Sequence, residues 1–141
     1  MPGRRRPICY APRTPKPGAA LSFVYLDLEV GRDGRFHGAA ALRDGQTRRW
    51  EKRPAAEVDR ELCAWLRPGD VLVGHNLHRF DLPEWARLVP GSALLGLPSL
   101  DTLELSVLAF PQRPYHALVK DDRLVRDALP NPAWDVALCE R

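Results

Sequence analysis

The octapeptide Phe23–Val30, FVYLDLEV, constrains the fold of this chain more than any other stretch. Apolar residues alternate along it with a period of two and Gly31 follows as a stop, so the pattern predicts a β-strand. One face of the strand would carry the four aliphatic side chains, and the other would carry Asp27 and Glu29 beside two aromatic rings. Two carboxylates on one side of an otherwise apolar strand repel each other and are costly to bury.

This acidic pair has two explanations. A bound divalent cation would neutralise Asp27 and Glu29, and their hard oxygen atoms suit magnesium or manganese better than zinc. Alternatively, the octapeptide is an edge strand with a solvated acidic face, which requires no ligand. Further acidic residues at suitable places in the chain would favour the cation.

Length and composition predict one soluble domain. A chain of 141 residues with 45% hydrophobic residues can form a core. It has no apolar run long enough to span a membrane and no signal-peptide core, so we expect a cytoplasmic protein. Cys9, Cys63 and Cys139 are odd in number and form no C-x-x-C pair, which favours reduced structural cysteines over a disulfide framework or a zinc knuckle.

Residues 1–20 differ from the rest of the chain in charge and proline content. They hold five basic residues, no acidic residue and five prolines, whereas residues 21–141 hold 16 basic and 18 acidic residues. We therefore expect a flexible basic arm before a domain at 21–141. The arm could hold a phosphate backbone by salt-sensitive attraction, or it could be a solubilising tail.

Turn signals and periodicity predict a mixed α/β sheet. Asp33-Gly34 and Asp44-Gly45 are turn dipeptides, which favours a three-stranded antiparallel meander that begins with the acidic strand. A helix and then a short buried strand, parallel to a neighbour, are expected next. After Phe23–Val30, the expected strands are therefore Phe36–Leu42, Gln46–Glu51 and Asp70–Gly74, and the expected helices are Ala55–Leu66 and a segment from Asp81 to about Leu88.

Polar residues follow the predicted strand Asp70–Gly74. Ligands gather at the carboxyl ends of strands in α/β sheets, so Asn76 and Asp81 lie where a site is expected. A helix-capping role alone would also explain Asp81. For His75 and His78 we expect hydrogen-bonded structural roles rather than zinc binding, because no cysteine or third histidine lies at a suitable spacing.

These motifs together resemble the DEDD-type 3′→5′ exonucleases, the superfamily of polymerase proofreading domains, which have a ribonuclease H-like fold. The first family motif, Asp-x-Glu on the first strand, is matched by Asp27 and Glu29. The second motif, Asn-x-x-x-Phe-Asp, is matched by Asn76, Phe80 and Asp81.

Further resemblance extends over residues 21–141. Asp101-Thr102, followed by an apolar helical run, matches an Asp-Thr that recurs at the end of a later strand in the family. Residues 105–121 look most like the exonuclease-type domains attached to RecQ-type helicases. The implied architecture is a ribonuclease H-like mixed sheet, an antiparallel three-stranded meander plus parallel strands, flanked by helices.

The third family motif is matched in part. Asp135, in a helix that Pro132 would begin, is the candidate for the fourth acidic residue. Family members carry a His five residues before this Asp or a Tyr four residues before it, whereas this chain has Pro130 and Asn131 there. We hypothesise that His116 or the neighbouring Tyr115 replaces the missing general base; a loop histidine hydrogen-bonded to the backbone is the alternative.

The resemblance implies hydrolysis of phosphodiester bonds at the 3′ end of single-stranded nucleic acid, with DNA favoured over RNA. Two magnesium or manganese ions would be bound, and a helicase domain or another protein is a further expected partner. The short stretch after Pro132 also fits a fragment or a module of a larger protein. The implied metal ligands are Asp27, Glu29, Asp81 and Asp135, the candidate base is His116, and the candidate substrate contacts are Asn76, Phe80, Tyr115 and Lys120.

Two other functions stay open. The first is an exonuclease fold that binds nucleic acid or a partner protein with weak or no cleavage, which the absent His or Tyr favours. The second is an unrelated small α/β interaction domain in which every acidic residue is structural.

Overall fold

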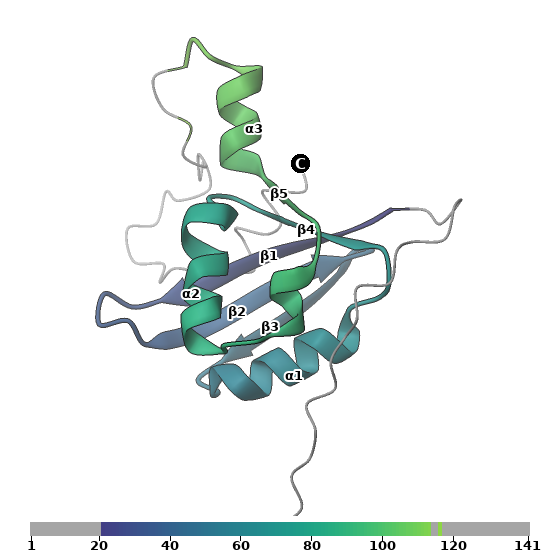
Figure 1. Cartoon of the computed structure of the whole chain (residues 1–141), viewed down its shortest axis with the longest axis vertical. Coiled ribbons are helices and arrows are strands. Elements are labelled where there is room, and N and C mark those ends of the chain that lie inside the picture. Colours follow the sequence, from purple (N-terminus) through teal and green to yellow (C-terminus); the bar gives the residue numbers. More distant parts are fainter. Residues whose placement is uncertain (1–20, 114–115, 117–141) are drawn as a thin grey trace, which may run out of the picture.

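A computed structural model describes residues 21–113 and residue 116 of the chain. They form a five-stranded sheet of order β3-β2-β1-β4-β5, with helices packed against it (Figure 1). The strands are β1 (Ser22–Val30), β2 (Phe36–Arg43), β3 (Gln46–Glu51), β4 (Asp70–Gly74) and β5 (Ser99–Asp101). The helical elements are α1 (Ala55–Trp65), the π-helical turn η1 (Leu77–Asp81), α2 (Leu82–Leu88), the 3₁₀ turn η2 (Ala93–Gly96) and α3 (Thr102–Ala109).

The sheet has an antiparallel half and a parallel half, as the sequence predicts. Strands β1, β2 and β3 form the antiparallel meander, while β4 pairs in parallel with β1 and with β5. Asp44 and Gly45 join β2 to β3 with φ values of 51° and 73°, the left-handed pair that a two-residue hairpin turn requires. The predicted mixed α/β sheet is therefore confirmed.

The pleat of β1 sorts its side chains as expected, with one exception. Val24, Leu26 and Leu28 are buried, whereas Asp27 is half-buried on the opposite face. Val30 was predicted to share the buried face, but it is partly exposed because the β1–β2 register shifts between residues 29 and 30. Such a bulge re-aims the side chains at the end of a strand.

The hydrophobic core lies between one face of the sheet and the helices. The buried side chains of β1 form one cluster with Val58, Leu62 and Trp65 of α1 and with Trp85 of α2. Figure 1 shows α1 and α2 on the same face of the sheet. The helical spacing of the three α1 residues puts them on one stripe toward the strands.

A buried ion pair joins β2 to the start of β4. Arg43 Nη1 donates to Asp70 Oδ2 at 3.0 Å and to the Trp65 carbonyl at 2.7 Å. The guanidinium also lies 4.2 Å from the centroid of the Trp65 ring. The Arg43 and Asp70 side chains are only 4% and 0% exposed, so this ion pair is buried, and the more exposed Asp44 carboxylate lies 3.9 Å from Arg43 Nε.

The basic arm predicted at residues 1–20 lies outside the described residues. Within the described part of the chain, no helix is long and apolar enough to cross a membrane.

Candidate functional site

The candidate site lies where the carboxyl ends of the parallel strands meet. Asp27 and Glu29 stand near the end of β1, on the half-buried face of that strand. Strand β4, beside β1, leads through Asn76 into η1, whose last residue is Asp81. Because β1 and β4 run in parallel, their C-terminal ends bring the two sequence motifs to the same edge of the sheet.

A hydrogen bond from the main chain of β1 joins these motifs. The Leu28 amide donates to Asp81 Oδ1 at 3.0 Å, and Asp81 is 2% exposed. The β1–β4 pairing ends at Tyr25, so Leu28 lies beyond the paired segment. Since Leu28 stands between Asp27 and Glu29, the bond brings the Asp81 carboxylate against the acidic segment of β1.

Asp81 stands at the N-cap position of α2, but the alternative explanation that its side chain serves only to cap this helix is wrong. Its backbone is already helical, with φ −63° and ψ −50°, and its side chain forms no capping bond. The helical path begins earlier, at Leu77, as a π-helical turn, a geometry found often at functional sites. The carboxylate is turned toward Leu28 instead, a partner 53 residues away in sequence.

Asp101 holds the loop that carries Asp81. It is 3% exposed and accepts three backbone hydrogen bonds, from the amides of Asn76 (2.9 Å), His78 (3.0 Å) and Leu103 (2.9 Å). The last of these caps α3, and the other two fix the start of η1. Sequence reasoning noted Asp101 only for its family resemblance; its place directly before an apolar helical run was the available signal for a cap.

Two candidate substrate residues have distinct environments. Asn76 has a left-handed backbone, φ 64°, a conformation that Asn tolerates better than most residues. The hydrogen bond from its backbone amide to Asp101 gives Asn76 a structural role in the turn, and contact with substrate stays a prediction. Phe80 is 39% exposed, so its ring is not a core side chain.

The remaining predicted site residues are not brought into this group by any described contact. The Nδ1 atom of His116 lies 2.9 Å from Ser106 Oγ on α3, a side-chain partner for this ring nitrogen. The other three, Tyr115, Lys120 and Asp135, lie outside the described residues.

The residue types of Asp27, Glu29 and Asp81 suit a hard divalent cation, although the ligand atoms of these three do not form one of the close groups found among the described residues. All the donor atoms are oxygen, the ligand type that magnesium and manganese prefer. One of the carboxylates, Asp81, is almost fully buried, and a buried anion is costly unless it is compensated. Within the described residues Glu29 forms no ion pair.

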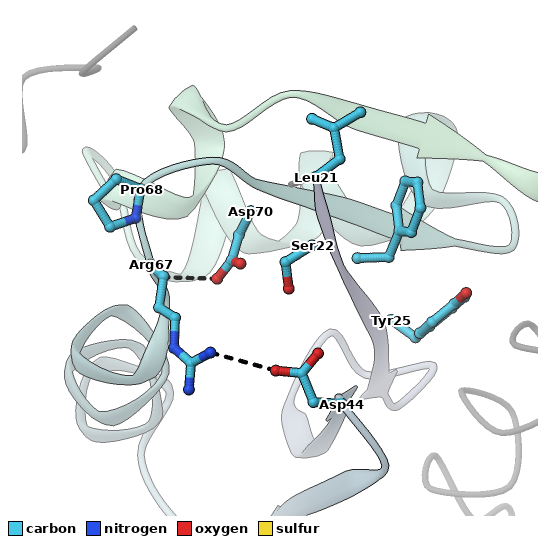
Figure 2. A pocket seen from close by; sticks show the side chains of 8 residues that line it. Leu21, Ser22, Tyr25, Asp44, Arg67, Pro68 and Asp70 are labelled. Atoms are coloured by element: carbon cyan, nitrogen blue, oxygen red, sulfur yellow. Dashed lines mark hydrogen bonds and ion pairs between the residues drawn. The ribbon is translucent and has the colours of Figure 1, made fainter. Parts of the chain in front are cut away.

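A cavity of about 500 Å³ lies at the opposite end of β1, away from these acids. Figure 2 shows Ser22 and Asp70 in its middle and the Arg67–Asp44 ion pair beside them. None of the predicted site residues lines it. The lining residues are Leu21, Ser22, Phe23, Tyr25, Asp44, Arg67, Pro68 and Asp70.

Comparison with known proteins gives a likeness of structure. No family model and no curated protein matches the sequence. Among solved structures, E. coli Exonuclease I in complex with a 5cy-dA13 oligonucleotide has a TM-score of 0.62 at 15% identity, over 85% of this chain and 39% of that chain. The same enzyme with a 5cy-dT13 oligonucleotide has a TM-score of 0.59 at 17% identity, over 86% and 39%. This chain therefore spans about two fifths of Exonuclease I, and the likeness shows that its fold is α/β and ribonuclease H-like.

Proposed function

We propose that this chain is a metal-dependent 3′→5′ exonuclease of the DEDD type, which hydrolyses phosphodiester bonds at single-stranded 3′ ends, with DNA favoured over RNA. The observation that carries the proposal is the bond from the Leu28 amide to Asp81, because it ties the second motif to the strand segment that carries Asp27 and Glu29. The likeness to an exonuclease in complex with an oligonucleotide adds support for a nucleic-acid ligand.

Each residue has a role in this proposal. Asp27, Glu29 and Asp81, joined by Asp135 from outside the described residues, hold the cations. Magnesium or manganese ions, when bound there, lower the pKa of the attacking water and offset charge on the departing 3′ oxygen. The exposed Phe80 ring offers a face on which the terminal base stacks.

The general base is the part of the family pattern that this chain lacks at its usual place, since Pro130 and Asn131 stand where the resemblance implies a His or Tyr. A positioned base contributes about 10²–10⁴-fold to rate, so its loss slows hydrolysis without abolishing it. We assign His116 as the replacement base. If Nδ1 carries the ring N–H and donates it to Ser106 Oγ, Nε2 is the nitrogen that would accept a proton from water.

Pro130 and Asn131, in place of the His or Tyr, favour a second candidate function. Without a base, the fold would bind nucleic acid or a partner protein and cut slowly or not at all. A helicase domain as that partner remains a sequence-based prediction.

The experiment that separates these functions is degradation of a 5′-labelled single-stranded DNA and a matching RNA with magnesium or manganese. Asp27→Asn is the test variant, because it removes one charge and keeps the side-chain shape. Asp33→Asn is the matched control, since Asp33 is an exposed acid of the β1–β2 hairpin.

We expect a ladder that shortens from the 3′ end, that persists in Asp33→Asn and that disappears in Asp27→Asn or in EDTA. Intact substrate with retained binding would instead support the binding module. Equal cleavage by wild type and Asp27→Asn would contradict the assigned site.

A further inference from the structure

A histidine and two acidic side chains converge from three elements beside the loop that carries Asp81. His78 comes from η1, Asp101 ends β5 and Glu104 lies in the first turn of α3. One ligand atom from each of the three lies within 4.8 Å of the others. We propose that these three side chains form a zinc site, made of different residues from the acidic group at Asp27.

The contacts of the His78 ring allow a metal-binding tautomer. Its Nε2 atom lies 3.0 Å from Ser99 Oγ, and its Nδ1 atom lies 3.1 Å from Glu104 Oε2. A neutral imidazole carries one N–H. In one tautomer Nδ1–H donates to Glu104 and Nε2 accepts from the Ser99 hydroxyl. In the other tautomer Nε2–H donates to Ser99, and the Nδ1 lone pair is available to a metal ion that the Glu104 carboxylate also faces. Ser99 then orients the ring from outside the cluster, as the outer partners of metal-binding histidines do.

Asp101 supplies a rigid third ligand. Its Oδ1 atom accepts the amides of Asn76 and Leu103, whereas Oδ2 accepts, among the described residues, only the amide of His78. A carboxylate oxygen has two lone pairs, so Oδ2 keeps one for a metal ion. Three backbone bonds hold this carboxylate before any ion arrives, which lowers the entropic cost of binding.

The charge of the cluster also favours a divalent ion. With a neutral ring, the two carboxylates carry a charge of about −2. Among the described residues, neither Asp101 nor Glu104 forms an ion pair with Lys or Arg, and His78 is the one ionic partner of Glu104.

The ligand types select the metal. One imidazole nitrogen with two carboxylate oxygens suits zinc, which takes nitrogen and oxygen ligands in a four-coordinate site with one position left for water. Magnesium prefers oxygen alone, so the acidic group at Asp27 and this cluster differ in preference. A zinc ion here would tie η1 to α3 and so fix the segment that positions Asp81.

The test is a titration of the metal-free full chain with zinc by calorimetry, repeated on His78→Gln and Glu104→Gln. We expect wild type to bind a zinc ion that each of these variants binds at least about tenfold more weakly. His37→Gln is the matched control, because His37 is an exposed histidine 4.0 Å from an acid, Asp33. It should bind zinc as wild type does, and because zinc binding is the readout, the result does not depend on the proposed exonuclease activity.

Cobalt in place of zinc provides a second readout. The complex should show visible ligand-field bands without a thiolate charge-transfer band, which separates this site from binding by cysteine. Unfolding curves in EDTA establish that each variant folds. Absence of zinc binding in wild type would overturn the proposal, and a hydrogen bond between His78 Nδ1 and Glu104 would then explain their contact. Equal zinc affinity in wild type, His78→Gln and Glu104→Gln would overturn it as well.

Discussion

Asp81 has two separable roles, since its carboxylate both accepts the Leu28 amide and carries a charge. Asp81→Ala removes both, whereas Asp81→Asn keeps an oxygen that can accept the amide. A buried donor left without a partner costs about 1–3 kcal/mol, so we expect Asp81→Ala to lower the free energy of unfolding by that amount. Asp81→Asn should cost less, because the Leu28 amide keeps an acceptor. Both variants should lose metal-dependent cleavage.

Urea unfolding in EDTA measures the stability difference with no metal bound. With a denaturant dependence of about 2 kcal/mol per molar, a loss of 2 kcal/mol moves the midpoint by about 1 M. Hydrogen exchange of the Leu28 amide should quicken in Asp81→Ala and not in Asp81→Asn. Equal destabilisation by the two variants, or unchanged exchange at Leu28 in Asp81→Ala, would refute the reasoning.

Three further predictions concern the scaffold. Arg43→Met leaves the buried Asp70 carboxylate uncompensated and should cost about 3–5 kcal/mol in urea unfolding, most of it recovered when Asp70→Leu is added. Gly74→Ala places a Cβ atom 2.9 Å from the Leu26 carbonyl and should cost about 1–3 kcal/mol, whereas Gly45→Ala, which meets no atom within 4 Å, tests for backbone strain alone. Burial raises the pKa of the Cys63 thiol, so its reaction with a disulfide reagent should be slower in the native chain than in urea at the same mildly alkaline pH. Because the folded pKa is the higher one, the stabilisation from this thiol is complete below the unfolded pKa and is lost as pH rises through the folded pKa.

The sequence predicts the parts of this fold that depend on neighbouring residues. The period of two in β1 and the left-handed pair Asp44-Gly45 are local properties, so the meander follows from them. The register shift at Val30 was not visible, because a bulge depends on how the partner strand pairs.

Long-range contacts explain what the sequence could not supply at the site. Asp81 has the sequence signature of a cap, yet its partner is a main-chain amide brought near by the pairing of two strands. Likewise, His75 and His78 have no cysteine or third histidine at a suitable spacing, and the acidic neighbours of His78, Asp101 and Glu104, come from β5 and α3. Such groups form only when the sheet is assembled.

Paramagnetic line broadening by manganese, followed by NMR for each backbone amide of the isotope-labelled chain, tests most directly the central claim of a metal centre at the end of β1. At substoichiometric manganese, the account predicts that the amides of Asp27, Leu28, Glu29 and Asp81 broaden first and that excess magnesium restores them. In Asp27→Asn the effect should need far more manganese. Sharp signals at Leu28 while amides around Glu104 alone broaden, or no selective broadening at all, would contradict a metal centre at the end of β1.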